Sequence, residues 1–182
     1  MTFHRESTPT KVGIIMGSDS DLKVMQHVGR ALRTLGIEHG EGYEERVVSA
    51  HRTPSWMREY TETAPDRGIQ VIVAGAGGSA HLPGMVASET NLPVLGVAIT
   101  SNTDVMNRAL GSMIGMPEGK PLATFQAEAG AFNAGLFAAR ILALQDPELD
   151  ATLTEYNENL AQAVMKKDSR LSELGAERYL SS

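Results

Sequence analysis

The sequence predicts an α/β protein built on a parallel sheet with helices on both faces. Two observations lead to this fold class. Short apolar runs of strand length alternate five times with segments that carry helical periodicity. Such alternation favours parallel strands joined by crossover helices. Hydrophobic residues make up 42% of the 182 residues, which is enough for one substantial core.

The first strand and helix are the most clearly marked. Residues 12–16 form a short apolar run, as expected of a strand that is buried on both faces. Ser18 or Ser20 can cap the helix that follows, and Gly36 can end it. The helix is predicted from apolar residues that recur every three or four positions: Leu22, Met25, Val28, Leu32 and Leu35.

Four more strand and helix pairs follow in order. Strands are predicted at 45–49, 70–74, 92–99 and 122–126. Helices are predicted at 54–64, 83–90, 105–114 and 130–145. Pro54 suits a first helical position, and the last of these helices is rich in Ala and Leu.

A further amphipathic helix is predicted at 147–174, after the last α/β unit. Its apolar residues keep helical spacing: Leu149, Leu153, Tyr156, Leu160 and Val164. Because the sheet faces already have their helices, docking on a neighbouring subunit is favoured over packing on its own domain. The predicted organisation is a disordered tail at 1–10, an α/β catalytic domain at 11–146 and a helical extension at 147–182.

Composition excludes several function classes. The chain has no cysteine, so disulfides and thiolate metal sites are excluded. A net charge of -6 without a basic run argues against nucleic-acid binding. No apolar run reaches the roughly 18–20 residues that span a membrane, and the polar N-terminus lacks a signal segment. The five histidines are scattered, so we expect no metal, and we expect a cytoplasmic protein.

Ligands of open parallel sheets bind beyond the carboxyl ends of the strands, so three loops are candidate sites. In the first, residues 17–21 (GSDSD), hydroxyls and backbone N–H groups can hold a phosphate, and a carboxylate can accept hydrogen bonds from ribose. Plain helix capping is the alternative interpretation. In the second, 49–54 (SAHRTP), a fixed cation stands beside the proton carrier His51, although a solvated loop is equally compatible.

The third loop, 74–84 (AGAGGSAHLPG), is rich in small residues that let the backbone approach a flat ligand. It lacks the glycine pattern of dinucleotide-binding folds, and a tight glycine-rich connection is the alternative. His81 can donate a hydrogen bond, carry a proton or order the loop; ordering or binding is favoured.

These three loops, followed by 92–97 (LPVLGV), together resemble the class I N5-carboxyaminoimidazole ribonucleotide mutases. The resemblance implies conversion of N5-carboxyaminoimidazole ribonucleotide to 4-carboxy-5-aminoimidazole ribonucleotide in purine biosynthesis, with neither metal nor organic cofactor. It also implies a flavodoxin-like three-layer sandwich, a homo-octamer, and active sites between subunits.

The resemblance also implies roles for individual residues. His51 matches the general acid/base. The residues that match the phosphate and ribose contacts are Ser18, Ser20, Asp21 and Arg52, and Gly17 is expected to bind the substrate beside them. Ser49 and Ala50 match the neighbours of the base. The residues that match the lining of the imidazole and the migrating carboxyl are Gly77, Gly78, Ser79, His81 and Leu82.

Two other functions stay open. A class II-like enzyme on the same fold would carboxylate aminoimidazole ribonucleotide directly from CO2; Arg52 and the sequence from His81 to Pro83 favour the mutase branch. A non-enzymatic flavodoxin-like module is disfavoured, because the three loops contain no aromatic residue to flank a flavin. The stretches 98–113 and 125–129 depart from the family's usual sequence.

Overall fold

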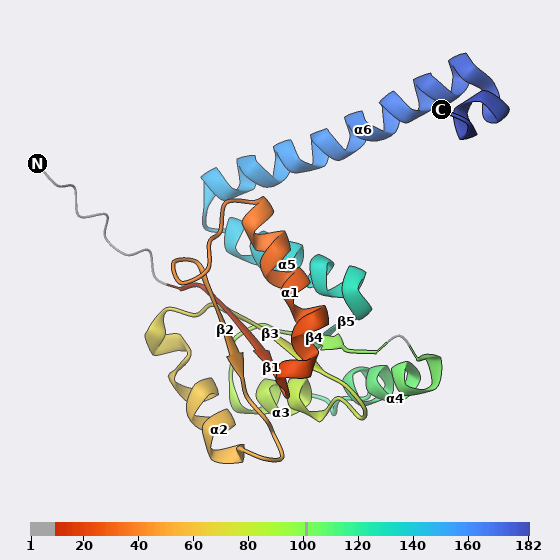
Figure 1. Cartoon of the computed structure of the whole chain (residues 1–182). Helices are drawn as coiled ribbons and strands as arrows, with labels where there is room; N and C mark the ends of the chain where they lie inside the picture. Colours follow the sequence, from red (N-terminus) through yellow and green to blue (C-terminus); the bar gives the residue numbers. More distant parts are fainter. Residues whose placement is uncertain (1–9, 101) are drawn as a thin grey trace, which may run out of the picture. The chain divides into compact units, whose positions relative to one another are not determined.

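The computed structural model describes residues 10–100 and 102–182, so nearly all of the predicted tail lies outside the described residues. Five strands form one parallel sheet in the order β2-β1-β3-β4-β5 (Figure 1). The strands are β1 (Val12–Met16), β2 (Tyr43–Val47), β3 (Val71–Ala76), β4 (Val94–Ala98) and β5 (Ala123–Gln126). This is the flavodoxin-like order, in which the chain reverses direction across the sheet between β1 and β3.

Helices cover both faces of the sheet, which confirms the predicted three-layer architecture (Figure 1). The first face carries α1 (Leu22–Thr34) and α5 (Ala127–Ala143). The second carries α2 (Pro54–Thr63), α3 (His81–Glu89) and α4 (Thr103–Ile114). A Cβ at Gly135 of α5 would overlap the Val28 carbonyl of α1, so glycine allows the two helices to approach closely.

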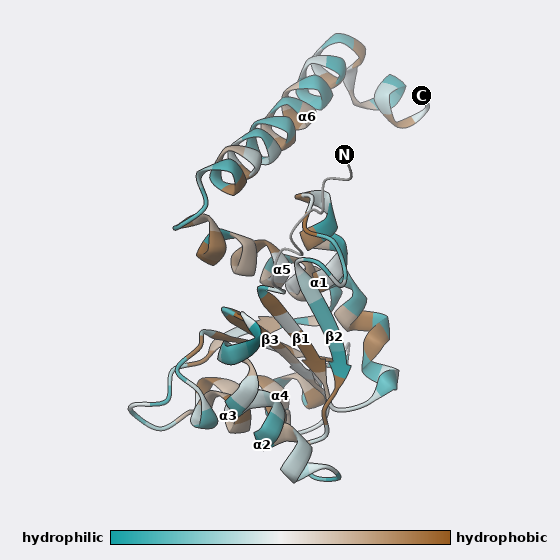
Figure 2. Cartoon of the chain, turned by 90° about the vertical axis from the view of Figure 1, so that its left-hand side faces the viewer, coloured by the Kyte–Doolittle hydropathy of each residue, from teal (hydrophilic) through white to brown (hydrophobic). Residues whose placement is uncertain are grey.

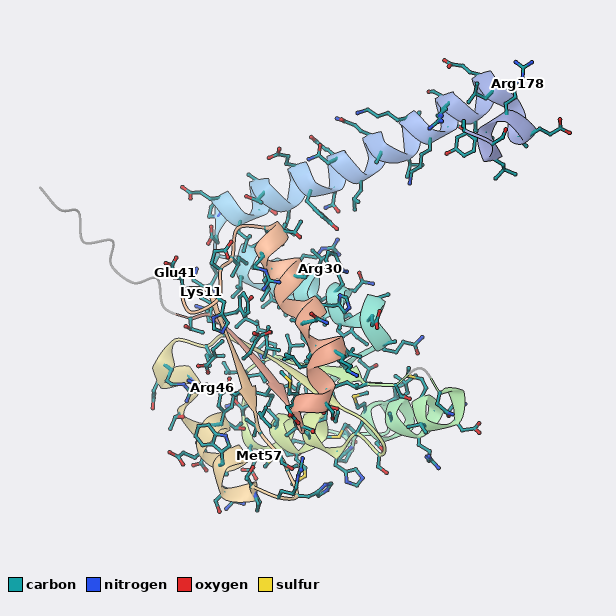
Figure 3. The ribbon with its side chains drawn as sticks, viewed as in Figure 1. Lys11, Arg30, Glu41, Arg46, Met57 and Arg178 are labelled. Atoms are coloured by element: carbon teal, nitrogen blue, oxygen red, sulfur yellow. The ribbon has the colours of Figure 1, made fainter. Side chains whose placement is uncertain are left out.

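The burial of each strand follows its place in the sheet. All five residues of β1 are buried, because this strand lies between β2 and β3. Figure 2 shows β1 in hydrophobic colours and the edge strand β2 in hydrophilic ones. Figure 3 labels Arg46 on β2, which is exposed, and Met57 on α2, which is buried in the core.

Four predicted elements begin earlier in the structure than in the sequence pattern. Helix α4 begins at Thr103 and not at 105, and helix α5 begins at Ala127 and not at 130. Strand β2 covers 43–47 and not 45–49, because it pairs in register with β1 from Val12↔Tyr43 to Met16↔Val47. Helix α3 begins at His81 and not at Pro83. Proline is tolerated in the first turn because N–H groups there have no partner within the helix.

The chain divides into two compact units, Met1–Leu142 and Ala143–Ser182. The second unit is dominated by α6 (Pro147–Leu180), which runs six residues beyond the predicted end and bends at Gly175 (φ 69°, ψ 164°). The Asp146 side chain accepts a hydrogen bond from the Leu149 N–H and caps α6 at its start. None of the helices at 10–100 and 102–182 is long and apolar enough to span a membrane.

Candidate active site

The three predicted loops meet at the carboxyl ends of β1, β2 and β3, where the strand order reverses. They line one open cleft of about 550 Å³. The first loop contributes Gly17 and Asp21, and the second contributes four consecutive residues, 49–52. The third loop contributes Ala76, Gly77, Ser79, Ala80, His81 and Leu82.

The first loop is held in place by its own side chains. Ser18 caps the 3-10 turn Asp19–Asp21, and its backbone N–H donates to the Asp21 carboxylate at 3.2 Å. The Ser20 hydroxyl lies 3.0 Å from the Ser18 hydroxyl. Burial raises the pKa of Asp21, although hydrogen bonds from Ser18 and Ser20 and the charge of Arg52 oppose this shift. The loop therefore presents one half-buried carboxyl, that of Asp21, at this cleft.

The second loop ties itself to the first through Arg52. The Arg52 guanidinium donates to the Gly17 carbonyl at 2.8 Å and to the Ser49 hydroxyl at 3.3 Å. The Thr53 hydroxyl accepts from the Ser49 N–H and donates to the Ser49 carbonyl, each at 3.1 Å. His51 thus lies in a short loop that is hydrogen-bonded on both sides.

The third loop reaches the cleft through an unusual backbone conformation. Gly78 has φ 63°, and Ala80 also has a positive φ of 48°, which is rare for a residue with a Cβ. The Ala80 N–H donates to the Gly77 carbonyl at 3.0 Å and closes the turn. This turn places His81 at the start of α3.

The two cleft histidines are in direct contact. His51 Nε2 lies 3.1 Å from His81 Nδ1, and the rings meet edge to face at 83°. The predicted proton carrier therefore has a second imidazole within hydrogen-bond distance.

A second, smaller cleft of about 310 Å³ adjoins the first. It is lined by Gly17, Ser18, Asp19, Val47, Ser49, Arg52 and Thr53. Gly17, Ser49 and Arg52 line both clefts, so the two share a wall. Arg52 is the one cationic side chain among the residues that line either cleft in the described chain.

The structure brings most of the predicted site residues together. Ten line the large cleft, Ser18 lines the small one, and Ser20 and Gly78 line neither although they belong to the same loops. Lining residues that were not predicted are Asp19, Val47, Thr53, Ala76 and Ala80. Thr53 directly follows His51 and Arg52 in the sequence, so its hydroxyl could have indicated that it belongs to the site.

A metal site is not formed by the part of the chain that the structure describes. No group of three or more His, Asp or Glu side chains is placed to hold an ion within 10–100 and 102–182. In the large cleft the charged side chains among the described residues are Asp21 and Arg52, beside the two histidines.

Residues 11–163 match the family described as AIR carboxylase. The chain belongs to this family. A relative from Thermotoga maritima, named N5-carboxyaminoimidazole ribonucleotide mutase, is 49% identical over 170 residues, covering 93% of this chain and 96% of that protein. A relative of the same name from Pyrococcus horikoshii is 47% identical over 181 residues, covering 100% of this chain and 99% of that protein.

A solved structure is similar over most of the chain. The crystal structure of Treponema denticola PurE is similar with a TM-score of 0.76 and 32% sequence identity. The match covers 89% of this chain and 98% of that one. The chain also resembles the chloroplastic phosphoribosylaminoimidazole carboxylase of Vigna aconitifolia, at 46% identity over 94% of this chain and 30% of that protein.

Proposed function

We propose that this protein is an N5-carboxyaminoimidazole ribonucleotide mutase of purine biosynthesis. The observation that carries the proposal is the near-complete match, at 47–49% identity, to relatives of that name. The cleft supports it independently, because a histidine pair, a fixed cation and a half-buried carboxyl line one pocket. The reaction moves a carboxyl group from the exocyclic nitrogen of the aminoimidazole to ring carbon C4.

The two adjoining clefts suit the two ends of a ribonucleotide. We assign the phosphate to the small cleft, where Ser18 and Arg52 offer a hydroxyl and a guanidinium. We assign the imidazole to the large cleft beside His51. Asp21, on the wall of the large cleft, is suited to accept hydrogen bonds from ribose hydroxyls. In this pose the nucleotide spans the shared wall.

His51 can serve both halves of the reaction as acid and then as base. As the carbamate N–C bond breaks, cationic His51 gives a proton to the exocyclic nitrogen, and CO2 is released. The electron-rich C4 then attacks the CO2 and forms the new C–C bond. Neutral His51 removes the proton from C4, which restores the aromatic ring and the cationic histidine.

The remaining task of the cleft is to keep the CO2 beside C4. Holding two reactants in position contributes up to ~7–11 kcal/mol to a reaction in well-oriented cases. The third loop supports this role, because Gly77, Ser79 and Ala80 are small and allow the backbone to close around a flat ring.

A direct carboxylase is the second candidate. The relative from Vigna aconitifolia, at 46% identity, carries the name phosphoribosylaminoimidazole carboxylase. An assay of the purified protein with each imidazole nucleotide, with and without bicarbonate, separates the two. We expect turnover of the N5-carboxylated compound without bicarbonate. If the protein instead turns over aminoimidazole ribonucleotide and not the N5-carboxylated compound, and does so only when bicarbonate is present, it is a direct carboxylase.

We also propose that the protein assembles as a homo-octamer in the cytoplasm. The exposed apolar residues of α6, Leu160 and Val164, support assembly, because they continue the stripe that begins with the buried Leu149 and Leu153. The mass of the purified protein by light scattering tests the octamer, and cell fractionation tests the location.

A further inference from the structure

His51 and His81 contact each other directly in the large cleft. The two rings come from different parts of the sequence, thirty positions apart, with 3.1 Å between Nε2 of His51 and Nδ1 of His81. Each is held by its own loop: Thr53 and Arg52 fix the second loop, and the turn closed by Ala80 fixes the third. The contact is therefore built from two anchored loops.

A hydrogen bond between two imidazole nitrogens needs one N–H and one bare nitrogen. Suppose that His81 Nδ1 donates. Neutral His51 then accepts at Nε2, and taking up a proton there would set N–H against N–H and break the bond. Suppose instead that His51 Nε2 donates. Neutral His51 then has a bare Nδ1, and it can gain and lose a proton at Nδ1 while the bond to His81 persists.

The position of His81 favours the second arrangement. It is the first residue of α3, a helix of nine residues, and a positive charge at a helix N-terminus is unfavourable. The other charged side chains that line the cleft with the two rings, among the described residues, are Asp21 and Arg52.

We infer that His81 is a positioning residue: its Nδ1 accepts a hydrogen bond from His51 Nε2, fixes the His51 tautomer, and leaves His51 Nδ1 to exchange protons with the substrate. The inference deepens the proposed function and rests on it for its catalytic meaning. The same nitrogen then gives the proton in the first half of the reaction and takes it in the second.

The test compares His81→Ala with His81→Asn in the full-length protein. An asparagine oxygen can accept the His51 hydrogen bond near the position of Nδ1, whereas alanine cannot. We expect His81→Ala to lower kcat by about tenfold to a hundredfold, which is part of the contribution of acid/base catalysis. KM should change by less than about threefold. His81→Asn should restore most of the lost kcat. A wild-type kcat in His81→Ala, or a loss that appears in KM alone, would overturn the inference.

A second readout needs no turnover. Long-range proton–nitrogen NMR spectra of histidine-labelled protein, with His51→Asn used to assign the signal, report the tautomer of neutral His51. We expect one tautomer, with the proton on Nε2, in the wild type and a mixture in His81→Ala. The same mixture in both proteins would overturn the inference. An inactive wild type that still shows the single tautomer would instead count against the proposed function.

Discussion

Asp21 carries a half-buried carboxyl group on the first loop of the cleft. Burial raises its pKa above the ordinary value of 3.8. The folded protein therefore binds this proton more tightly than the unfolded chain does. The stabilisation of the fold by this proton is complete below the pKa that Asp21 has in the unfolded chain. It is lost as pH rises through the pKa that Asp21 has in the folded protein. At neutral pH the ionised carboxylate destabilises the fold.

Asp21→Asn should therefore raise the free energy of unfolding at pH 7 and change it little near pH 3. The Asn oxygen can still accept from the Ser18 N–H, so the loop conformation is expected to persist. Urea denaturation at the two pH values measures the effect. Asp19→Asn, a change to an exposed neighbour on the same turn, is the control and should raise the value at pH 7 by less, because the charge of Asp19 is the smallest of the causes that shift the pKa of Asp21. A lower stability at pH 7 in Asp21→Asn would contradict the account.

Individual site residues were predictable where a residue type alone suggests chemistry. His51, Arg52 and Asp21 were identified in this way. The direct contact between His51 and His81 was not, because it depends on the positive φ of Ala80, and nothing in an alanine indicates that conformation. Asp19 and Thr53 were not predicted as site residues, yet they line the small cleft.

At the scale of elements, β1 packs against α2 through one close contact. A Cβ at Gly13 of β1 would overlap the hydroxyl of Tyr60 on α2. Tyr60 is 1% exposed, and its hydroxyl makes no hydrogen bond of normal geometry among the described residues, although Glu44 and Arg67 lie near enough to affect its pKa. Burial is the main cause that raises the pKa of Tyr60, so its hydroxyl stays neutral.

Gly13→Ala should therefore destabilise the protein by about 1–3 kcal/mol, as overpacking of a core does. Tyr60→Phe should be neutral or stabilising, because it removes a buried hydroxyl that makes no hydrogen bond of normal geometry. The double variant should recover most of the loss, and denaturation of all four proteins measures the coupling. Additive effects would show that the glycine is required for a different reason.

The elements themselves were predicted well because apolar periodicity determines them. The five strands and six long helices all lie where the pattern indicates. Several of their ends were not predictable, because they depend on partners distant in the sequence. Strand β2 begins at Tyr43 because that residue pairs with Val12. The 3-10 turn before α1 depends on capping by the Ser18 side chain, which the pattern of apolar residues does not indicate.

At the scale of the whole molecule, α6 presents apolar side chains that the chain leaves uncovered. Leu160 is 51% exposed and Val164 is 63% exposed, one turn apart on the same stripe. The Leu160→Asp, Val164→Asp double variant should reduce the assembled mass in light scattering, because charges on a buried interface are unfavourable. Gln162→Asp, on the opposite side of the helix, is the matched control. An unchanged mass in the double variant would show that this stripe is not part of the assembly.

The proposed reaction depends on one proton carrier, His51, in the cleft where the three loops meet. His51→Asn keeps a side chain of similar polarity and removes the acid/base. Binding of the product nucleotide by calorimetry and turnover of N5-carboxyaminoimidazole ribonucleotide, measured on the same preparation, test its role directly. We expect an affinity within about threefold of the wild type and a turnover reduced by about 10²–10⁴, the usual contribution of acid/base catalysis. Turnover within about tenfold of the wild type, with the nucleotide bound, would show that His51 is not the proton carrier.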